Sequence, residues 1–323
     1  MATIKDVAKK ANVSVATVSR VVNNTGYVNT ETRNLVLDAI KSLDYIPSEL
    51  ARSLFKKQSN LIGVIIPHLT TYFYGELIEA LEDAVIDKGY RLMTFNSRND
   101  AKREERFMNV FSQYHISGLI VAAHLNKLRS YQKLSLPMVA IDHHVSDTIP
   151  SISSDNEMGG ELAAKHFLKR KAKKLIHFRG ASFLLTVKDR DHGFKKTLEG
   201  SGIDIIDADL DFNNPDLDLI ERTLQAHRDC DGIFCDGDLI AMHVIKVAEK
   251  LKLKIPDDVE LIGYDDLKLD QLVTPTLSSI KQDIEQIAKK AIESLIGLIQ
   301  DPQATLPDHQ TFPVRLIERD STQ

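Results

Sequence analysis

The sequence has few features of an extracellular, membrane or disulfide-stabilised protein. Its 323 residues include only two cysteines, Cys230 and Cys235, which flank an apolar segment typical of a strand and are interpreted as buried structural thiols. No apolar run approaches the roughly 18 residues of a membrane span. The chain opens on Met1-Ala-Thr-Ile-Lys-Asp, which has no signal-peptide pattern. We therefore expect a cytoplasmic protein with no membrane partner.

Common catalytic motifs are also absent. The sequence has no G-x-S-x-G, no G-x-x-x-x-G-K-[ST] and no G-x-G-x-x-G after a predicted strand. His143, His144 and His192 have aspartates nearby, but their spacing matches no closed metal site. We expect a protein that is not an enzyme and that needs no metal or cofactor.

Acidic residues slightly outnumber basic ones over the whole chain, but basic residues are in excess at its N-terminal end. The whole chain carries a net charge of −5, whereas residues 1–60 contain nine Lys and Arg against five Asp and Glu, a net +4. The remaining residues therefore carry −9. A basic N-terminal segment on an acidic body indicates phosphate or nucleic-acid binding at that end.

Residues 3–23 predict two short helices joined by a polar turn. Thr3 can cap the first helix and Ser14 the second, and the second helix repeats valine at the spacing of a buried stripe, Val15, Val18, Val21 and Val22. Such a pair is typical of a helix-turn-helix, whose second helix lies in the DNA major groove. By itself the pair also fits a small helical core without DNA contacts.

Two further helices are predicted before residue 60. The segment from Glu31 reads as a third helix, with Leu35, Ile40 and Leu43 facing inward. After it, Pro47 occupies a helix start. Leu50, Ala51 and Leu54 then share one face.

Beyond residue 60, apolar strands alternate with amphipathic helices. Near-continuous apolar strands are typical of parallel sheets covered on both faces, and two rounds of the pattern predict two similar α/β lobes. Ligands of such sheets bind beyond the carboxyl ends of the strands, here in the cleft between the lobes. Polar and aromatic residues follow most of the predicted strands.

Several of these segments together resemble the LacI/GalR family of bacterial transcription regulators. They are T-I-K-D-V-A, N-V-S-V-A-T-V-S-R-V-V-N, the third-helix T-R and Y-x-P-S-x-x-A-R-S-L. The resemblance implies a three-helix headpiece at residues 1–46, a hinge helix and linker at 47–60, and a two-lobed periplasmic-binding-protein-like core at 61–323. Lobe 1 is expected at about 61–156 plus 285–323, and lobe 2 at about 157–284.

In this family two hinge helices pair in the minor groove of a palindromic operator, where a leucine opens the central base step. On this chain that leucine is Leu54; Ala51 permits the close helix contact and Arg52 reaches phosphates. A homodimer is implied, since a symmetric operator needs two headpieces. The residues predicted to contact DNA are Thr3, Ser14, Ala16, Thr17, Ser19, Arg20, Asn23, Tyr45, Ala51, Arg52 and Leu54.

The resemblance also implies effector residues in the cleft. R-x-x-G-F matches Arg190 to Phe194, and G-Y-D-D places Asp265 as an effector ligand. Asp155, in S-D-N-E-x-G-G, is interpreted as a subunit or inter-lobe contact. The residues predicted to contact the effector are Tyr72, Phe73, Asn96, His143, Arg190, His192, Phe212, Asp236, Asp238 and Asp265.

The identity of the effector stays open. Gly237 stands where many sugar-responsive members carry Asn or Ser. The contact that this side chain usually makes with the effector is therefore either missing here or made by Asp236 instead. Residues 143–156 resemble sucrose-operon repressors and favour a sucrose- or fructose-type sugar that controls a carbohydrate operon. A purine corepressor is one alternative, and a global catabolite regulator with a phosphocarrier protein partner is another. A free sugar-transport protein is disfavoured by the headpiece.

Overall fold

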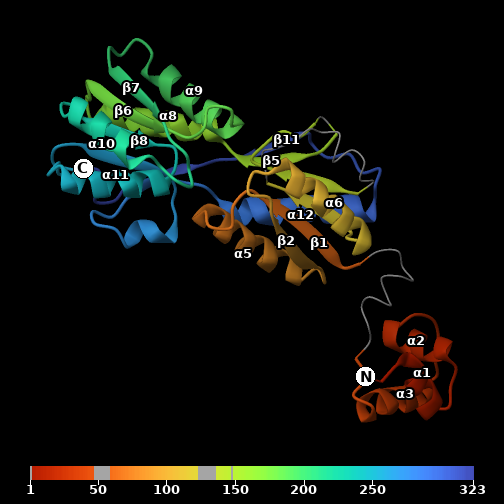
Figure 1. Ribbon diagram of the computed structural model, residues 1–323. Helices are drawn as coiled ribbons and strands as arrows, with labels where there is room; N and C mark the ends of the chain where they lie inside the picture. The colour runs from red at the N-terminus through yellow and green to blue at the C-terminus, as the bar shows by residue number, and fades with distance from the viewer. Residues whose placement is uncertain (1, 47–58, 123–135, 147) are drawn as a thin grey trace. The chain divides into compact units, whose positions relative to one another are not determined.

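The computed structural model describes residues 2–46, 59–122, 136–146 and 148–323 (Figure 1). The chain forms two compact units, Met1–Ser59 and Asn60–Gln323. The predicted hinge residues Ala51, Arg52 and Leu54 lie outside the described residues.

The N-terminal unit contains the three expected helices, α1 (Ile4–Lys10), α2 (Val15–Asn23) and α3 (Thr30–Ser42). Thr3 caps α1 in a reciprocal pair with Asp6, and the Ser14 hydroxyl accepts the Thr17 N–H at 3.1 Å. The buried core of this unit consists of Val7, Ala8, Ala11, Val18, Val21, Val36 and Ala39.

Two inward positions were predicted wrongly in this unit. Val15 is 42% exposed and Leu35 is 51% exposed, whereas Val36 and Ala39 are buried. In the third helix, Ile40 and Leu43 pack against this core as predicted, and Val36 takes the inward place that was predicted for Leu35.

The first lobe of the core is a six-stranded parallel sheet between helices. Its strands, in spatial order, are β11 (His309–Phe312), β5 (Ser151–Ser154), β4 (Met138–Ile141), β3 (Gly118–Val121), β1 (Leu61–Ile66) and β2 (Arg91–Asn96). Apolar side chains of α5 (Tyr72–Ile86) and α12 (Ile284–Gln300) bury one face. Those of α6 (Ala101–Gln113) cover the other.

The second lobe repeats this plan. Its strand order is β12 (Arg315–Ile317), β10 (Ser278–Lys281), β9 (Glu260–Asp265), β8 (Gly232–Cys235), β6 (Lys174–Arg179) and β7 (Asp204–Asp209), with only β12 antiparallel. Helices α10 (Leu217–Ala226) and α11 (Asp238–Lys250) cover one face, and α8 (Asn156–Lys169) and α9 (Leu185–Leu198) the other (Figure 1). A short 3-10 helix, η1 (Lys268–Gln271), follows β9.

The chain passes between the two sheets after β5, after β10 and after β11. The third passage contradicts part of the predicted lobe boundary, because β12 pairs with β10 of the second sheet and Ser321 bonds to Leu261 beyond it. Residues 315–323 therefore belong to lobe 2. The sequence pattern also missed β5 (SISS) and β10 (SSIK), because serine-rich strands lack an apolar run.

Helices α8 and α9 cross at two glycines. A Cβ atom on Gly160 would lie 2.0 Å from the Arg190 carbonyl oxygen, and one on Gly193 would lie 2.0 Å from the Glu157 carbonyl oxygen. Only glycine permits this backbone approach. The crossing fixes the position of Arg190 on α9.

Candidate functional site

A cavity of about 190 Å³ lies between the two lobes, at the carboxyl ends of the strands. The lining residues from lobe 1 are Pro67, His68, Thr71, Phe73, Tyr74, Asn99 and Asp142. Those from lobe 2 and the passage after β10 are Ala181, Phe183, Leu184, Thr186, Arg190, Asp211, Phe212, Asn213, Asp265 and Gln282. At its edge the Thr71 hydroxyl donates to the Asn213 side chain across the two lobes.

Arg190 is the buried cation of this cavity. Its Nε donates to Asn156 Oδ1 at 2.8 Å, one Nη donates to the Asp236 carbonyl oxygen, and its guanidinium carbon lies 3.6 Å from the centre of the Tyr264 ring. The Tyr264 hydroxyl donates to the same Asn156 oxygen at 3.2 Å. A guanidinium has five donors, so these bonds leave others for a ligand. The arginine is held rigidly before any ligand arrives.

Two carboxyl groups face this cation. Burial raises the pKa of Asp142 to about 6, against the opposing charge of Arg190. Burial also raises the pKa of Asp265 well above its usual range. Gln282 donates to Asp265 Oδ1 at 2.6 Å. Asp265 has a φ of 119°, a backbone conformation that is unfavourable for a side-chain-bearing residue and that concentrates at functional sites.

Two acceptors in the cavity have no hydrogen-bond partner among the described residues. They are Asp142 Oδ1 and Gln282 Oε1, and both are buried. Buried polar atoms in folded proteins are normally paired, so such atoms beside a cavity point to a ligand that supplies donors. Ligand hydroxyl groups would fit these positions.

The aromatic prediction is supported for Phe73 and Phe212, which both line the cavity. The Phe212 ring packs against two glycines: a Cβ on Gly180 would lie 2.2 Å from it, and one on Gly237 would lie 3.2 Å from it. Gly237, where many sugar-responsive family members carry Asn or Ser, therefore makes room for the Phe212 ring. It does not simply remove a polar contact.

The predicted ligand roles of Asp236 and Asp238 are contradicted. The Asp236 carboxylate is fully buried, accepts the Gly180 N–H at 2.9 Å and pairs with His177. The Asp238 carboxylate accepts from the Ser279 hydroxyl and the Leu267 N–H. Both side chains therefore point into lobe 2. There each accepts a backbone N–H from the loop that follows a neighbouring strand.

Four other predicted effector residues do not line the cavity. Tyr72 is half-exposed, Asn96 accepts the Arg98 N–H, and His143 bonds to the Ile141 carbonyl oxygen. His192 is exposed and lies 3.6 Å from Glu157 on the outer side of α9. Counting positions after a strand finds the correct loop but not the direction of each side chain.

The prediction missed several lining residues. Asp142, Tyr74, Thr186 and Gln282 line the cavity but were not among the predicted ligands. Asp142 directly follows β4, which is the one signal that could have identified it. Gln282 follows β10, the strand that the apolar pattern missed.

The predicted DNA-contacting residues of the headpiece fall into two groups. Ser14, Ala16 and Arg20 are exposed, whereas Thr17, Ser19, Asn23 and Tyr45 are half-buried. The Ser14 and Thr17 hydroxyls lie 2.9 Å apart and Asn23 donates to Ser19, while Tyr45 packs against the headpiece core. The Thr3 hydroxyl donates to Asp6. The exposed residues Ser14 and Ala16 lie at the start of α2, the end that was predicted to approach DNA.

Comparisons with known proteins identify both units. Residues 3–48 match the family of bacterial regulatory proteins, lacI family, and residues 164–322 match the periplasmic binding protein-like domain. The ribose operon repressor of Halalkalibacterium halodurans is 35% identical over 100% of this chain and 97% of its own length. The chain belongs to the LacI family. The family resemblance seen in the sequence is confirmed.

Three further proteins are similar to this chain. The sucrose operon repressor of Pediococcus pentosaceus is 34% identical over 98% of each chain. A lac repressor dimer bound to operator and an anti-inducer has a TM-score of 0.88 at 26% identity, over 99% of this chain and 98% of that one. A regulator core from Alkaliphilus metalliredigens complexed with D-xylulofuranose has a TM-score of 0.76 at 28% identity, over 82% of this chain and 100% of that one.

These comparisons confirm the predicted fold class, with a helix-turn-helix headpiece and a periplasmic-binding-protein-like core of the LacI family. Within the part of the chain that the structure describes, no helix is long and apolar enough to cross a membrane.

Proposed function

We propose that this protein is a transcriptional repressor of a carbohydrate operon whose effector is a single-ring furanose sugar. The effector binds in the cavity between the lobes, and as a homodimer the protein holds a palindromic operator with its two headpieces. Effector binding favours one arrangement of the lobes. The resulting change in operator affinity cannot exceed the ratio of the effector's affinities for the two arrangements.

The observation that carries the proposal is the arrangement of Arg190, Asp142 and Gln282 around the cavity. Asp142 Oδ1 and Gln282 Oε1 are buried acceptors without a partner among the described residues, and Arg190 supplies donors beside them. Adjacent sugar hydroxyls both donate and accept hydrogen bonds, so they match this set. Phe73 and Phe212 provide apolar surface for the ring.

The size of the cavity supports a monosaccharide. An apolar cavity of about 150 Å³ in another protein holds one benzene ring, and the cavity here measures about 190 Å³. One sugar ring fits this space better than the two rings of sucrose. Relatives named for ribose and sucrose operons, and the D-xylulofuranose in a similar core, support a furanose such as ribose or fructose.

The proposal is tested by thermal shift and calorimetry with D-ribose, D-fructose, sucrose and purine bases. A ligand that binds only the folded state raises the melting temperature. We expect one furanose to bind and to change the affinity of the full chain for its operator.

Arg190→Gln should weaken that binding by about 30-fold or more, since truncating a buried charge partner costs about 2 kcal/mol or more. The matched control is His192→Gln, two positions along the same helix but exposed, and it should bind as the wild type does. If a purine base binds and the sugars do not, the purine corepressor becomes the proposed effector in place of the sugar. No response to any of these compounds would contradict the effector proposal and make a phosphocarrier protein the next partner to test.

A further inference from the structure

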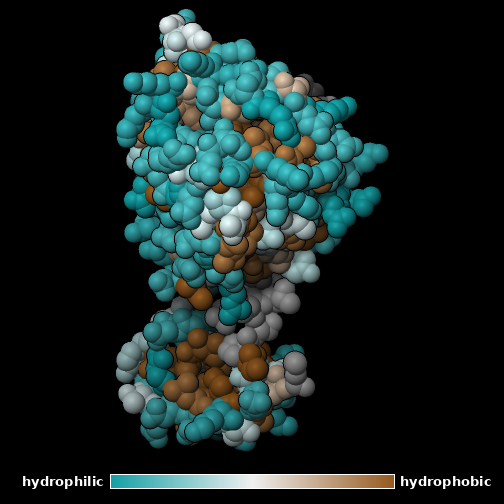
Figure 2. All heavy atoms as spheres, turned by 90° about the vertical axis from the view of Figure 1, so that its left-hand side faces the viewer, coloured by the Kyte–Doolittle hydropathy of each residue, from teal (hydrophilic) through white to brown (hydrophobic). Residues whose placement is uncertain are grey.

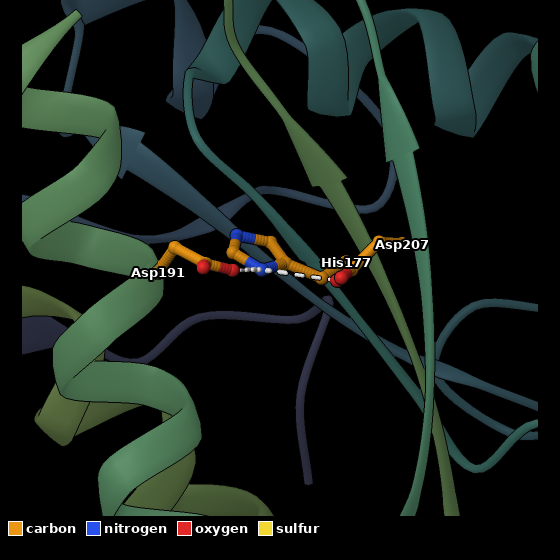
Figure 3. A group of neighbouring side chains, drawn as sticks. All are labelled: His177, Asp191 and Asp207. Carbon is orange, nitrogen blue, oxygen red and sulfur yellow. Dashed lines mark ion pairs between the residues drawn. The ribbon is translucent and has the colours of Figure 1, made fainter. Parts of the chain in front are cut away.

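His177 lies at the centre of lobe 2 with a carboxylate on each side of its ring. It belongs to β6, is fully buried, and stacks on Phe234 with the ring centres 4.8 Å apart. Its Nε2 lies 2.9 Å from Asp236 Oδ1 and its Nδ1 lies 3.5 Å from Asp191 Oδ1. Figure 3 shows the ring between Asp191 on the helix and Asp207 on the neighbouring strand.

Asp236 connects this histidine to the effector cavity by two routes. Its carboxylate accepts the Gly180 N–H at 2.9 Å, and Gly180 precedes the lining residues Ala181 and Phe183. Its carbonyl oxygen accepts from the Arg190 guanidinium. One residue therefore separates His177 from both the cavity arginine and a cavity wall.

Other cations already neutralise the outer carboxylates. Lys195 lies 2.8 Å from Asp191 and 2.7 Å from Asp207, and Arg179 lies 3.1 Å from Asp207. The Asp236 side chain pairs with His177 instead. The ionisable groups that face His177 are Arg179 on its own strand, Asp191 and Lys195 on α9, Asp207 on β7 and Asp236 after β8.

A neutral imidazole has one donor and one acceptor nitrogen, so one carboxylate would face a lone pair. Nδ1 is buried and forms no hydrogen bond with the described residues, and only the doubly protonated ring presents an N–H to both Asp236 and Asp191. We propose that His177 is a buried imidazolium and a positioning residue, which holds Asp236 in place and so links sugar binding in the cavity to a proton. The link to sugar rests on the function proposed above.

The pKa of His177 is shifted in the direction that the proposal requires. Burial alone would lower the pKa of His177, but the Asp236 and Asp191 carboxylates outweigh it and the pKa is raised. Coupling is reciprocal, so if the protonated ring positions the cavity, sugar affinity is highest below this pKa and falls as the pH rises through it. Ionisation of Asp142 above about pH 6 acts in the opposite direction by strengthening an acceptor.

The three atoms of His177, Asp191 and Asp207 also lie within 4.8 Å of one another, a spacing that a divalent cation could bridge. Lys195 and Arg179 already occupy the same carboxylates, which favours the proton. A bound cation is therefore an outcome that the test must distinguish.

The first measurement is a pH titration of the full chain labelled at histidine and glycine, followed by NMR, with His177 assigned by comparison with His177→Gln. We expect the His177 ring to lose its second proton at a higher pH than an ordinary histidine, and Asp191→Asn to move its titration to lower pH. The Gly180 amide resonance should follow the same titration. A ring that titrates at or below the pH of an ordinary histidine, or one broadened by equimolar Mn²⁺ in a way that identifies a cation site, would overturn the proposal.

The second measurement is the affinity for D-ribose by calorimetry between pH 6 and 9. We expect wild-type affinity to fall several-fold as the pH rises through the His177 titration, and His177→Gln to bind more weakly with a flatter profile. His166→Gln is the matched control, because His166 is also buried in lobe 2 between two carboxylates, Glu260 and Glu318. It should keep the wild-type profile.

A His177→Gln protein with the wild-type affinity and pH profile would refute the link. If that variant does not fold, Asp191→Asn serves instead, since it should shift the midpoint of the affinity profile to lower pH. If the wild type binds no sugar at all, the proposed effector fails. The proton on His177 and its effect on Gly180 are then still decided by the NMR titration.

Discussion

The two lobes share one strand order but differ in what they bury. The core of lobe 1, between its sheet and the helices α5 and α12, is built from aliphatic and aromatic side chains. Lobe 2 adds buried ionisable groups to its apolar clusters, among them His166, His177, Arg190, Asp236, Asp238, Glu260 and Asp270. On the face of the core unit that Figure 2 shows, most of the visible residues are hydrophilic. One topology therefore supports both an apolar scaffold and a polar network.

The polar network of lobe 2 is connected to the cavity. Arg190, which lines the cavity, contacts the Asp236 backbone, and Asp236 contacts His177. In lobe 1 the lining carboxylate Asp142 has an oxygen without a partner among the described residues. We infer that the contacts of Arg190 hold it in place beforehand, whereas Asp142 in lobe 1 and Gln282 after β10 each offer an acceptor that a ligand completes.

The largest expected effect concerns apolar packing. Leu77→Ala, in the fully buried core of lobe 1, should lower the free energy of unfolding by about 2–5 kcal/mol. Urea denaturation measures it. Leu224→Ala is the matched change in lobe 2, where the side chain is equally buried. A much smaller cost at Leu224 would show that the polar network, and not packing, stabilises lobe 2.

A smaller loss of stability is expected at the α8–α9 crossing. In Gly193→Ala the new methyl group meets the Glu157 carbonyl oxygen, and such overpacking costs about 1–3 kcal/mol. Because α9 carries Arg190, sugar affinity should fall with stability. Gly297→Ala in α12 is the control, since nothing lies within 4 Å of its Cβ position. Normal sugar binding by Gly193→Ala would contradict the role of the crossing in placing Arg190.

The buried Asp270 gives a pH-dependent prediction. Burial raises its pKa to about 7, and burial together with the charge of Asp270 raises the pKa of Asp238 well above its usual range. A pKa raised in the folded state means that protonation favours folding. The stability from this pair is present below about pH 4 and is lost as the pH rises toward 7.

Asp270→Asn replaces a carboxyl group, which donates a hydrogen bond only when it is protonated, with an amide that donates at every pH. It should raise the free energy of unfolding at pH 7.5 by about 1 kcal/mol and have little effect at pH 4.5. Thermal unfolding at the two pH values measures the difference. Equal effects at both would show that the pair is not protonated in the folded protein.

The smallest effect is expected at the contact between the lobes. Thr71→Val removes the hydroxyl that donates to Asn213 across the cavity edge, and a neutral hydrogen bond contributes about 1 kcal/mol. If this contact favours the sugar-binding arrangement, the dissociation constant for the sugar should rise by about fivefold. Thr223→Val, on the remote helix α10, is the control. Tighter binding by Thr71→Val would show that the contact favours the other arrangement.

The headpiece illustrates how far local sequence rules reach. The caps at Thr3 and Ser14 were predicted correctly, because capping depends on residues within one helical turn. The inward face of α3 was predicted wrongly at Leu35, because its burial depends on how α3 packs against the other helices.

The sequence by itself determined the family, the helix caps, the two-lobed parallel architecture and the cavity residues Arg190, Asp265, Phe73 and Phe212. Only the tertiary structure decided that Asp236 and Asp238 turn inward, that Asp142 and Gln282 face the cavity, and that β12 joins lobe 2. Local patterns record periodicity and turn chemistry along the chain. The direction of a side chain at a strand end, and the sheet that a short strand joins, depend on neighbours that are distant in sequence.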